Sequence, residues 1–342
     1  MKKISYFIYT FTAVMLMLWL LPWTIKFFTA KPSNSPFILY SSVIKDFAYI
    51  DIQKERDLKY CDLSGNKYTE REFDSILPFF YTRQLIQDER LPDSINGIKI
   101  SPKLIQHENF IFISKPYEIN INKIGLYFLM ESMSKRIDLK MPDDVFRTTS
   151  QGIEFIDMKS NEINEAKSKL FTETMKNKGL VFPIIEINGN PTTRKEYDEG
   201  YVILDYNNNL FHFKMVKGRP YVRKIELPND ITLKHLFITE FNNRKTLAFA
   251  TDVNNKFFVI SNKTYEVSKV AIPSFNPEKE TIRIIANMLD WTIQIDSETR
   301  NDYYAINAND FSLIQKYENQ IEKTWNGLHF TEYTDNYVYP RF

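Results

Sequence analysis

Residues 4–25 form an uncharged, strongly apolar run near the N-terminus, and this run constrains the chain more than any other feature. As a helix with ~1.5 Å rise per residue it would extend about 33 Å, enough to cross a hydrocarbon core of roughly 30 Å. Trp19 and Trp23 lie towards its C-terminal end, where aromatic rings favour the membrane interface. The sequence therefore predicts a transmembrane signal anchor over residues 1–30.

A cleaved signal peptide is the alternative to an anchor. Such a peptide usually has an apolar region of about 7–15 residues followed by a small-x-small cleavage site. The run here is longer, and the nearest candidate site, residues 28–30, begins with a bulky Phe. We therefore favour the anchor, with the membrane contacted through residues 4–25.

The orientation of the anchor is less strongly encoded, because lysines flank both ends of the apolar run. Lys2 and Lys3 favour an N-terminus inside the cell, whereas Lys26 and Lys31 nearly balance them. The very short tail before the run is typical of a signal anchor. We expect a single-pass protein of the inner membrane, with the bulk of the chain in the periplasm.

The charge balance excludes one class of partner. The chain has 44 basic and 43 acidic residues, a net charge of +1, whereas a nucleic-acid binder needs a basic excess to neutralise phosphates. We expect no nucleic-acid partner. The single cysteine, Cys61, cannot form an internal disulfide and is expected to be buried as a small apolar residue.

After a short linker at residues 31–36, residues 37–342 are expected to form a β-rich extracytoplasmic domain. Aromatic residues make up 15% of the chain, which favours half-buried strands. Strands are predicted over 37–52 and 58–63. Thr69 and Glu72 fit a capping box that begins a helix, and Pro78 should kink it or break it into two short helices.

The next part of the chain is expected to mix short strands with helices. Between 97 and 147 the pattern predicts short strands, one of them at 111–114, and one helix near 122–136. A strand is expected at 152–157. Residues 161–179 could be a hairpin arm or a helix ending at Gly179, and we favour a strand first with the helix after it.

Three segments beyond residue 200 share one layout of an Asn/Asp turn, an aromatic-rich strand, a second turn and a further strand. They cover 207–225, 254–270 and 301–317, and Leu210, Phe257 and Tyr303 occupy matching places. Another strand precedes each segment, at 200–206, 245–253 and 291–298, and the last two have a further strand upstream, at 235–241 and 281–287. Residues 152–168 are interpreted as an earlier, divergent copy.

Four short strands recurring every 40–50 residues is the period of propeller blades, which must stack because one sheet cannot bury both faces alone. The predicted fold is therefore mainly β: an N-terminal transmembrane helix followed by a β-propeller-like domain with a few inserted helices. A β-sandwich or mixed sheet is the alternative. The domain could divide into an α/β part at 37–150 and a repeat part at 151–342, with residues 328–339 as a closing strand that pairs with the N-terminal strands.

No catalytic signature is recognisable. None of the four histidines pairs with another His or Cys at metal-ligand spacing, and there is no nucleophile elbow. Residues 205–209 faintly resemble the start of a calcium loop, but Leu210 and Val216 stand where the loop needs Gly and Glu. A tight turn explains them better. The sequence thus predicts no enzyme, no catalytic residue, no metal site and no cofactor.

Residues 77–97 are the densest mixture of aromatic and charged side chains. Arg and Tyr are enriched at interface hot spots, so this stretch could form an exposed surface that binds a partner. The alternative is a solvated helix face tied to the next loop by salt bridges. The candidate partner-binding residues are Tyr81, Arg83, Asp88, Arg90 and Asp93.

A family resemblance is found in three stretches of the sequence. They are GNKYTEREFDSILPFFYTRQLIQDERLPDSINGIKI (65–100), SKRIDLKMPDDVFR (134–147) and GIEFID (152–157). The chain resembles an uncharacterised domain-of-unknown-function family of membrane-anchored proteins from the Bacteroidota, over nearly its whole length. The resemblance implies a membrane-associated protein of the kind suspected of belonging with ABC-type export systems. It supplies no site residues.

Three functional hypotheses remain at this stage. The first is a periplasmic binding or accessory module with a membrane-protein partner such as an ABC-type transporter, which should leave an apolar or aromatic patch uncovered. The second is an extracytoplasmic hydrolase acting on glycans, which should bring two carboxylates into one pocket with unequal environments. The third is a sensor subunit, disfavoured because only about three residues would lie inside the cell.

Overall fold

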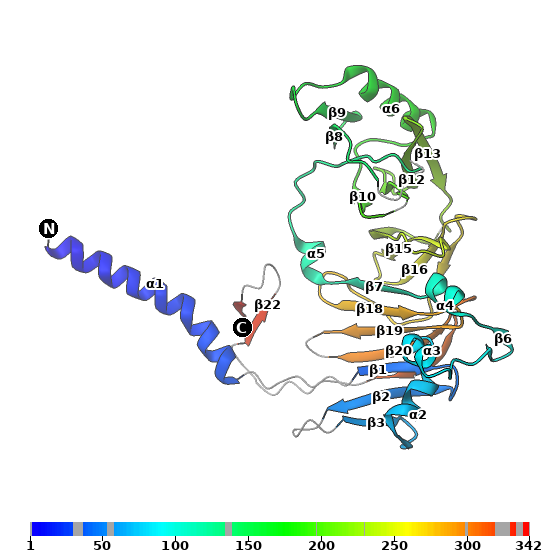
Figure 1. The fold of residues 1–342 in the computed structure, drawn as a ribbon. Coiled ribbons are helices and arrows are strands. Elements are labelled where there is room, and N and C mark those ends of the chain that lie inside the picture. The colour runs from blue at the N-terminus through cyan, green and yellow to red at the C-terminus, as the bar shows by residue number, and fades with distance from the viewer. Residues whose placement is uncertain are drawn as a thin grey trace.

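A long N-terminal helix and an array of antiparallel sheets make up the computed structural model of the protein (Figure 1). It describes residues 2–29, 37–52, 58–133, 139–195, 197–228, 230–297, 300–318, 329–332 and 338–341. Helix α1 (Lys2–Thr29) is 28 residues long, and none of its apolar window Lys2–Leu21 is buried against protein. The prediction of one N-terminal helix long and apolar enough to span a membrane is confirmed.

Four four-stranded units, which we call blades, form the body of the protein. Within each blade every strand pairs antiparallel with the next strand along the chain. Blade I consists of β1 (Phe37–Ser41), β2 (Asp46–Ile52), β3 (Leu58–Asp62) and β4 (Lys67–Tyr68). Blade II consists of β10 (Glu186–Gly189), β11 (Tyr201–Leu204), β12 (Leu210–Val216) and β13 (Arg219–Ile225).

The other two blades follow directly along the chain. Blade III consists of β14 (Leu233–Ile238), β15 (Thr246–Asp252), β16 (Phe257–Ser261) and β17 (Val267–Lys269). Blade IV consists of β18 (Thr281–Ala286), β19 (Asp290–Asp296), β20 (Asn301–Asn307) and β21 (Leu313–Tyr317). Each predicted repeat segment is the third and fourth strand of a blade, so the repeat is confirmed.

The blades bury their sheets by stacking face to face. All seven residues of β15 are buried, because blades II and IV cover its two faces. Leu204 of blade II and Leu236 of blade III belong to one buried cluster, and the rings of Phe249 of blade III and Trp291 of blade IV lie 6.1 Å apart. Blade I packs on blade IV in another buried cluster, which includes Phe47 and Tyr303. The spatial order is therefore II, III, IV, I, and the stack does not close into a ring (Figure 1).

A fifth strand joins blade IV from the N-terminal part of the chain. Strand β7 (Phe110–Ser114) pairs antiparallel with β18, with Phe110 opposite Ala286 and Ser114 opposite Ile282. The predicted strand at 111–114 is thereby confirmed. The proposed division near residue 150 stays a prediction, although the two parts on either side of it share this sheet.

Short helices and hairpins connect the blades. After blade I come α2 (Glu70–Ile76), α3 (Thr82–Gln87), β5 (Ser94–Ile95), β6 (Ile98–Lys99) and α4 (Pro102–Glu108). After β7 come α5 (Pro116–Asn120), β8 (Asp144–Thr148), β9 (Ile153–Asp157) and α6 (Glu165–Asn177), and β22 (His329–Glu332) pairs with β23 (Val338–Arg341) near the C-terminus. Thr69 and Glu72 form the predicted capping box, and the chain breaks into α2 and α3 around Pro78 as predicted.

Three sequence-based expectations are wrong. The described part of 122–136 is not helical: Tyr127 and Phe146 exchange backbone hydrogen bonds of 2.8 and 2.7 Å, which hold the segment extended. Residues 152–168 are not a divergent blade but β9, a turn and the start of α6, so the favoured order of strand then helix is confirmed. Within 328–339, the described strands pair with each other, and blade I instead completes the array by packing on blade IV.

Buried aspartates build matching turns between the second and third strands of blades II and III. Asp205 accepts hydrogen bonds from the backbone N–H groups of Asn207 and Asn209, at 2.9 and 2.8 Å. Asp252 accepts from the backbone N–H groups of Asn254 and Lys256 at the same two distances. The residues that resemble a calcium loop are therefore a turn whose carboxylate is already satisfied by the backbone.

We predict that Asp205→Ala lowers the free energy of unfolding by about 1–3 kcal/mol, because turn N–H groups lose their buried acceptor. Asp205→Asn, which keeps an acceptor oxygen, should lose less. Urea unfolding followed by circular dichroism measures both variants. Equal losses for Ala and Asn would contradict this role of the carboxylate oxygen.

Candidate functional site

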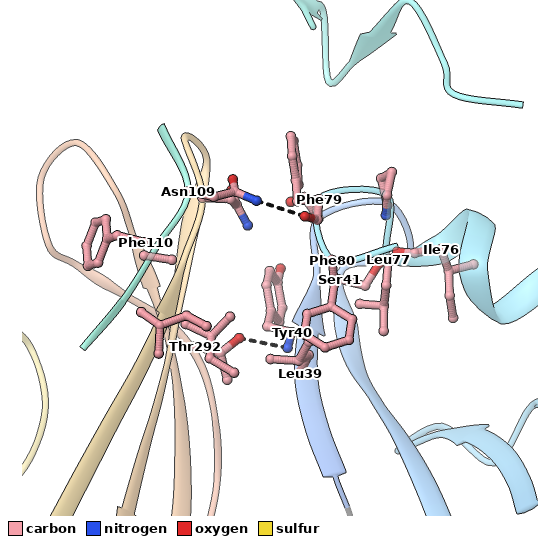
Figure 2. A pocket seen from close by; sticks show the side chains of 16 residues that line it. Leu39, Tyr40, Ser41, Ile76, Leu77, Phe79, Phe80, Asn109, Phe110 and Thr292 are labelled. Carbon is pink, nitrogen blue, oxygen red and sulfur yellow. Dashed lines mark hydrogen bonds between the residues drawn. The ribbon is translucent and has the colours of Figure 1, made fainter. Parts of the chain in front are cut away.

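An apolar cleft of about 480 Å³ lies between blades I and IV, beside the turn that joins α2 to α3 (Figure 2). Strand β1 supplies one wall, and the ends of β18 and β7 supply the other. The apolar side chains that line it include Leu39, Ile76, Leu77, Phe79, Phe80 and Ile285. A cleft of this volume and lining is typical of a site for a small apolar group.

The break at Pro78 gives the cleft its aromatic wall. Because proline cannot continue the hydrogen bonding of α2, the chain turns after Leu77 and presents two successive phenylalanines. Phe79 is 9% exposed and packs inward, whereas Phe80 is 45% exposed. The Phe80 ring lies 5.0 Å from the ring of Phe37. The cleft therefore has a buried aromatic wall and an uncovered aromatic ring beside it.

One polar side chain of the lining keeps an unused hydrogen-bonding atom. The Asn109 amide nitrogen donates to the carbonyl oxygen of Phe79 at 2.8 Å, which fixes the orientation of the amide (Figure 2). The Asn109 Oδ1 atom is buried and has no hydrogen-bond partner among the described residues. A buried acceptor without a partner is costly. A guest in the cleft that carries one donor would satisfy it.

Hydrogen bonds link blade I to blade IV beside the cleft. The Tyr40 backbone N–H donates to Thr292 Oγ1 at 2.9 Å. Ser42 donates to Asp290, which also accepts from the Asn287 side chain at 3.0 Å. Burial raises the pKa of Asp290 to about 6, although the hydrogen bonds from Ser42 and Asn287 oppose the shift.

The predicted partner-binding residues are only partly brought together. Tyr81, Asp88 and Arg90 line a shallow hollow of about 500 Å³ between α2 and α3, whereas Arg83 and Asp93 are exposed and do not line it. Burial raises the pKa of Tyr81 to about 12. Whether this surface binds a partner stays a prediction.

Arg90 has a clear structural role in this hollow. Its guanidinium lies 2.7 Å from Asp88 and 3.7 Å from Asp74, and it donates to the Arg71 carbonyl at 2.9 Å. The hydrogen bonds from Arg90 lower the pKa of Asp88. These contacts tie the end of α3 to α2, as the salt-bridge alternative anticipates, and they hold the turn that walls the cleft. Sequence reasoning missed the cleft itself, because its walls come from segments about 250 residues apart.

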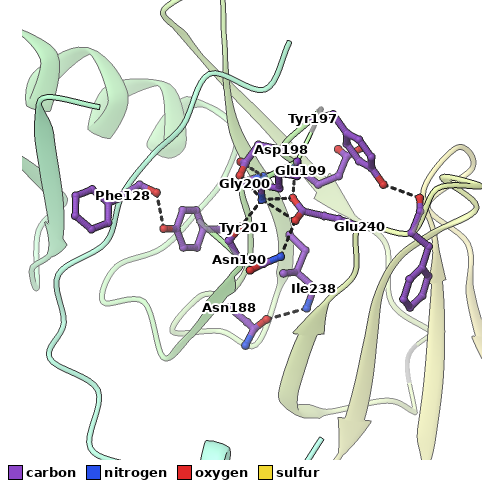
Figure 3. A network of polar contacts seen from close by, with 12 residues as sticks. Phe128, Asn188, Asn190, Tyr197, Asp198, Glu199, Gly200, Tyr201, Ile238 and Glu240 are labelled. Carbon is purple, nitrogen blue, oxygen red and sulfur yellow. Dashed lines mark hydrogen bonds and ion pairs between the residues drawn. The ribbon is translucent and has the colours of Figure 1, made fainter. Parts of the chain in front are cut away.

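A second cluster of charged groups lies buried between blades II and III (Figure 3). Lys195 lies 2.7 Å from Asp198 and 2.6 Å from Glu240, and both carboxylates are almost fully buried. Burial raises the pKa of Asp198 and of Glu240, although Lys195 opposes both shifts. The ammonium group of this one lysine thus forms ion pairs with two carboxylates.

Glu199 continues this cluster towards blade III. Burial disfavours its charge, but hydrogen bonds from Lys214 at 2.7 Å and Asn262 at 3.0 Å outweigh burial and lower its pKa. Its backbone N–H donates to Glu240 at 2.9 Å. Gly200, at φ +66°, lets this corner form, because a Cβ there would collide with the Phe213 carbonyl oxygen.

His212 lies fully buried beside this cluster. Burial lowers its pKa to about 4, so the ring is neutral at physiological pH. It bonds to the Glu199 carbonyl at 2.6 Å and to the Tyr265 hydroxyl at 2.9 Å. The hydrogen bond of His212 to Tyr265 and that of Asn262 to Glu199 therefore tie blade II to blade III.

No group of three or more His, Cys, Asp or Glu side chains that could hold a metal ion occurs among the residues with described positions. Cys61 is buried, as the sequence predicts.

Comparison with known proteins places the chain in a sequence family. Residues 37–306 match the family described as a domain of unknown function, DUF4857. No curated protein matches the chain.

Solved structures that resemble the chain are β-propellers. They include the Dos1 propeller, at 8% identity and a TM-score of 0.31, with 52% of this chain and 44% of that chain covered. The WD40 domain of SCAP from fission yeast has 10% identity and a TM-score of 0.30, with 90% and 79% covered. The chain thus spans less than half of the Dos1 propeller chain. Scores this low carry no argument beyond fold class, which rests on the blades themselves.

We predict that Lys195→Met lowers the free energy of unfolding by about 3–5 kcal/mol, because it leaves two buried carboxylates without their cation. The double variant Lys195→Met/Glu240→Gln should recover part of that loss. Denaturant unfolding at pH 7 measures both, and a double variant no more stable than the single one would contradict the charge-based explanation.

A second prediction concerns the buried carboxyl group of Asp290, which links blade I to blade IV. Since its folded pKa is raised to about 6 from 3.8, the folded state binds the proton more tightly than the unfolded state does. Proton binding by Asp290 therefore stabilises the folded state fully below about pH 4. This contribution, up to about 3 kcal/mol of the free energy of unfolding, is lost as the pH rises through about 6.

The test compares wild type with Asp290→Asn, which keeps an acceptor for Ser42 but cannot titrate. Unfolding free energies measured from pH 4 to pH 7 should diverge in favour of the Asn variant as pH rises. Parallel curves for the two proteins would overturn the prediction.

Proposed function

We propose that this chain, which belongs to the DUF4857 family and carries a helix long enough to span a membrane, is a membrane-anchored accessory module. In this proposal the module binds a membrane-protein partner. The partner inserts an apolar side chain into the cleft between blades I and IV. We propose a single-pass inner-membrane protein of a Gram-negative bacterium of the Bacteroidota, with the blades in the periplasm and a transporter subunit, of an ABC-type system, as the partner.

The cleft is the observation that carries this proposal. It combines apolar walls, an uncovered ring at Phe80 and Asn109 Oδ1, a buried acceptor with no partner among the described residues. A tryptophan or tyrosine side chain has the matching chemistry, since each offers a large apolar ring with one donor. Such rings, buried in a pocket at the centre of an interface, supply much of the binding energy between proteins.

The charged residues favour binding over catalysis. The buried carboxylates Asp198, Glu199 and Glu240 are each held by a lysine. A glycan hydrolase needs one carboxylic acid and one carboxylate facing the same sugar, and these three face lysines instead. The apolar cleft fits an accessory role better than a hydrolytic one.

The proposal is tested by recovering the partner from membranes. Tagged full-length protein, solubilised in mild detergent, should bring down a transporter subunit. Phe80→Ser should reduce the recovered partner about tenfold or more, because it removes an aromatic contact at the mouth of the cleft.

The matched control is Ile314→Ser, at an equally exposed apolar position (45%) on β21, away from the cleft. It should leave recovery unchanged. Recovery of the wild-type protein without a partner would overturn the proposal. An equal reduction of the recovered partner in Phe80→Ser and Ile314→Ser would also overturn it.

A further inference from the structure

A strip of apolar side chains lies uncovered between β7 and blade II. We define the strip as Ile113, Tyr117, Ile121, Ile124 and Leu126. Their exposed fractions are 40%, 42%, 51%, 90% and 49%. Single exposed apolar residues need no explanation, but five within fourteen residues mark a surface that something covers.

The strip is held in place rather than loosely attached. Ile119, between its members, packs on the core shared by blades III and IV. Asn120 donates to the Glu278 carbonyl at 2.9 Å, and Tyr127 pairs with Phe146 just beyond the last member. The backbone is therefore fixed on both sides of Ile121 and Ile124, and these side chains project from a supported segment.

Two lysines and two glutamates lie in or beside the strip. Lys115, Glu118 and Lys123 are within residues 113–126, and Glu186 lies beside them. Lys123 lies 2.6 Å from Glu186, and the Lys115 ammonium lies 5.9 Å from the centre of the Tyr117 ring. Isoleucine and leucine flanked by tyrosine and lysine is the composition that favours a bilayer interface, where apolar groups enter and lysines remain at the headgroups.

The strip lies at the end of the blades where the membrane helix joins them. Ser114 is opposite Ile282 and Phe110 opposite Ala286, so β7 runs towards the same end at which β18 begins. The start of β1 and helix α5 accordingly lie on the same side of the array (Figure 1). Seven residues, 30–36, separate α1 from β1 and can span at most about 25 Å.

We infer that this strip is a second membrane contact, which rests on the lipid surface and sets the orientation of the blades above it. The short tether keeps that end of the array beside the bilayer, so lipid is the surface that reaches the strip first. The inference depends on α1 spanning a membrane and is independent of what the cleft binds.

The test measures the depth of a spin label in full-length protein reconstituted into nanodiscs of mixed zwitterionic and anionic lipids. The label is attached at Ile124→Cys in a Cys61→Ala background. The control label is at Val43→Cys, an apolar residue exposed by 45% that follows β1, at the other end of this strand from the tether. Oxygen partitions into lipid and a nickel chelate into water, so their collision rates with each label report its surroundings.

Label 124 should collide with oxygen more often than with the chelate, and its ratio of the two rates should exceed that of label 43 about threefold or more. Equal ratios would overturn the inference. Spin–spin broadening at label 124 in nanodiscs with two copies would also overturn it, because a second copy of the chain would then cover the strip.

A second measurement needs no cysteine change. A protease site replaces residues 31–36, and the tether is cut after reconstitution into liposomes. The wild-type blades should stay with the vesicles at least threefold more than the Ile121→Ser/Ile124→Ser variant, with Val253→Ser/Leu313→Ser as the control. Release of wild type and both variants to the same extent would overturn the inference, even if the cleft binds its partner.

Discussion

The structure depends on one packing constraint: its central sheets are apolar on both faces, so each must be covered twice. Strand β15 is buried along its whole length, which is possible only because blades II and IV sandwich blade III. In contrast, the outer strand β21 of blade IV is mostly exposed. Stacking meets this demand by letting each blade serve as the cover of the next.

Blade I shows how the constraint acts over a long sequence separation. It is formed first along the chain, yet it packs on blade IV, the last one. The intervening segment returns as β7 to extend the same blade. Blade IV therefore holds both halves of the domain together, and the apolar cleft arises where α2, α3 and β7 meet this junction. The contacts that join blade I to blade IV and the cleft lie at the same interface.

Buried carboxyl groups have different kinds of partner in two of the blade interfaces. Between blades II and III, two lysines are shared among three buried carboxylates. Between blades I and IV, Asp290 accepts hydrogen bonds from the neutral side chains of Ser42 and Asn287, and burial raises its pKa despite these hydrogen bonds. The second interface is the less tightly paired of the two, which suits a junction that leaves room for a guest.

The sequence by itself determined the features that are local. The apolar run of α1, the capping box at Thr69, the break at Pro78 and the repeated strands of blades II to IV each follow from neighbouring residues. Only the tertiary structure decided the irregular path of 122–133, the pairing of β7 with β18, and the cleft. These depend on contacts between segments up to about 250 residues apart, such as Tyr40 with Thr292, and local propensity carries no information about which distant strand or side chain supplies the partner.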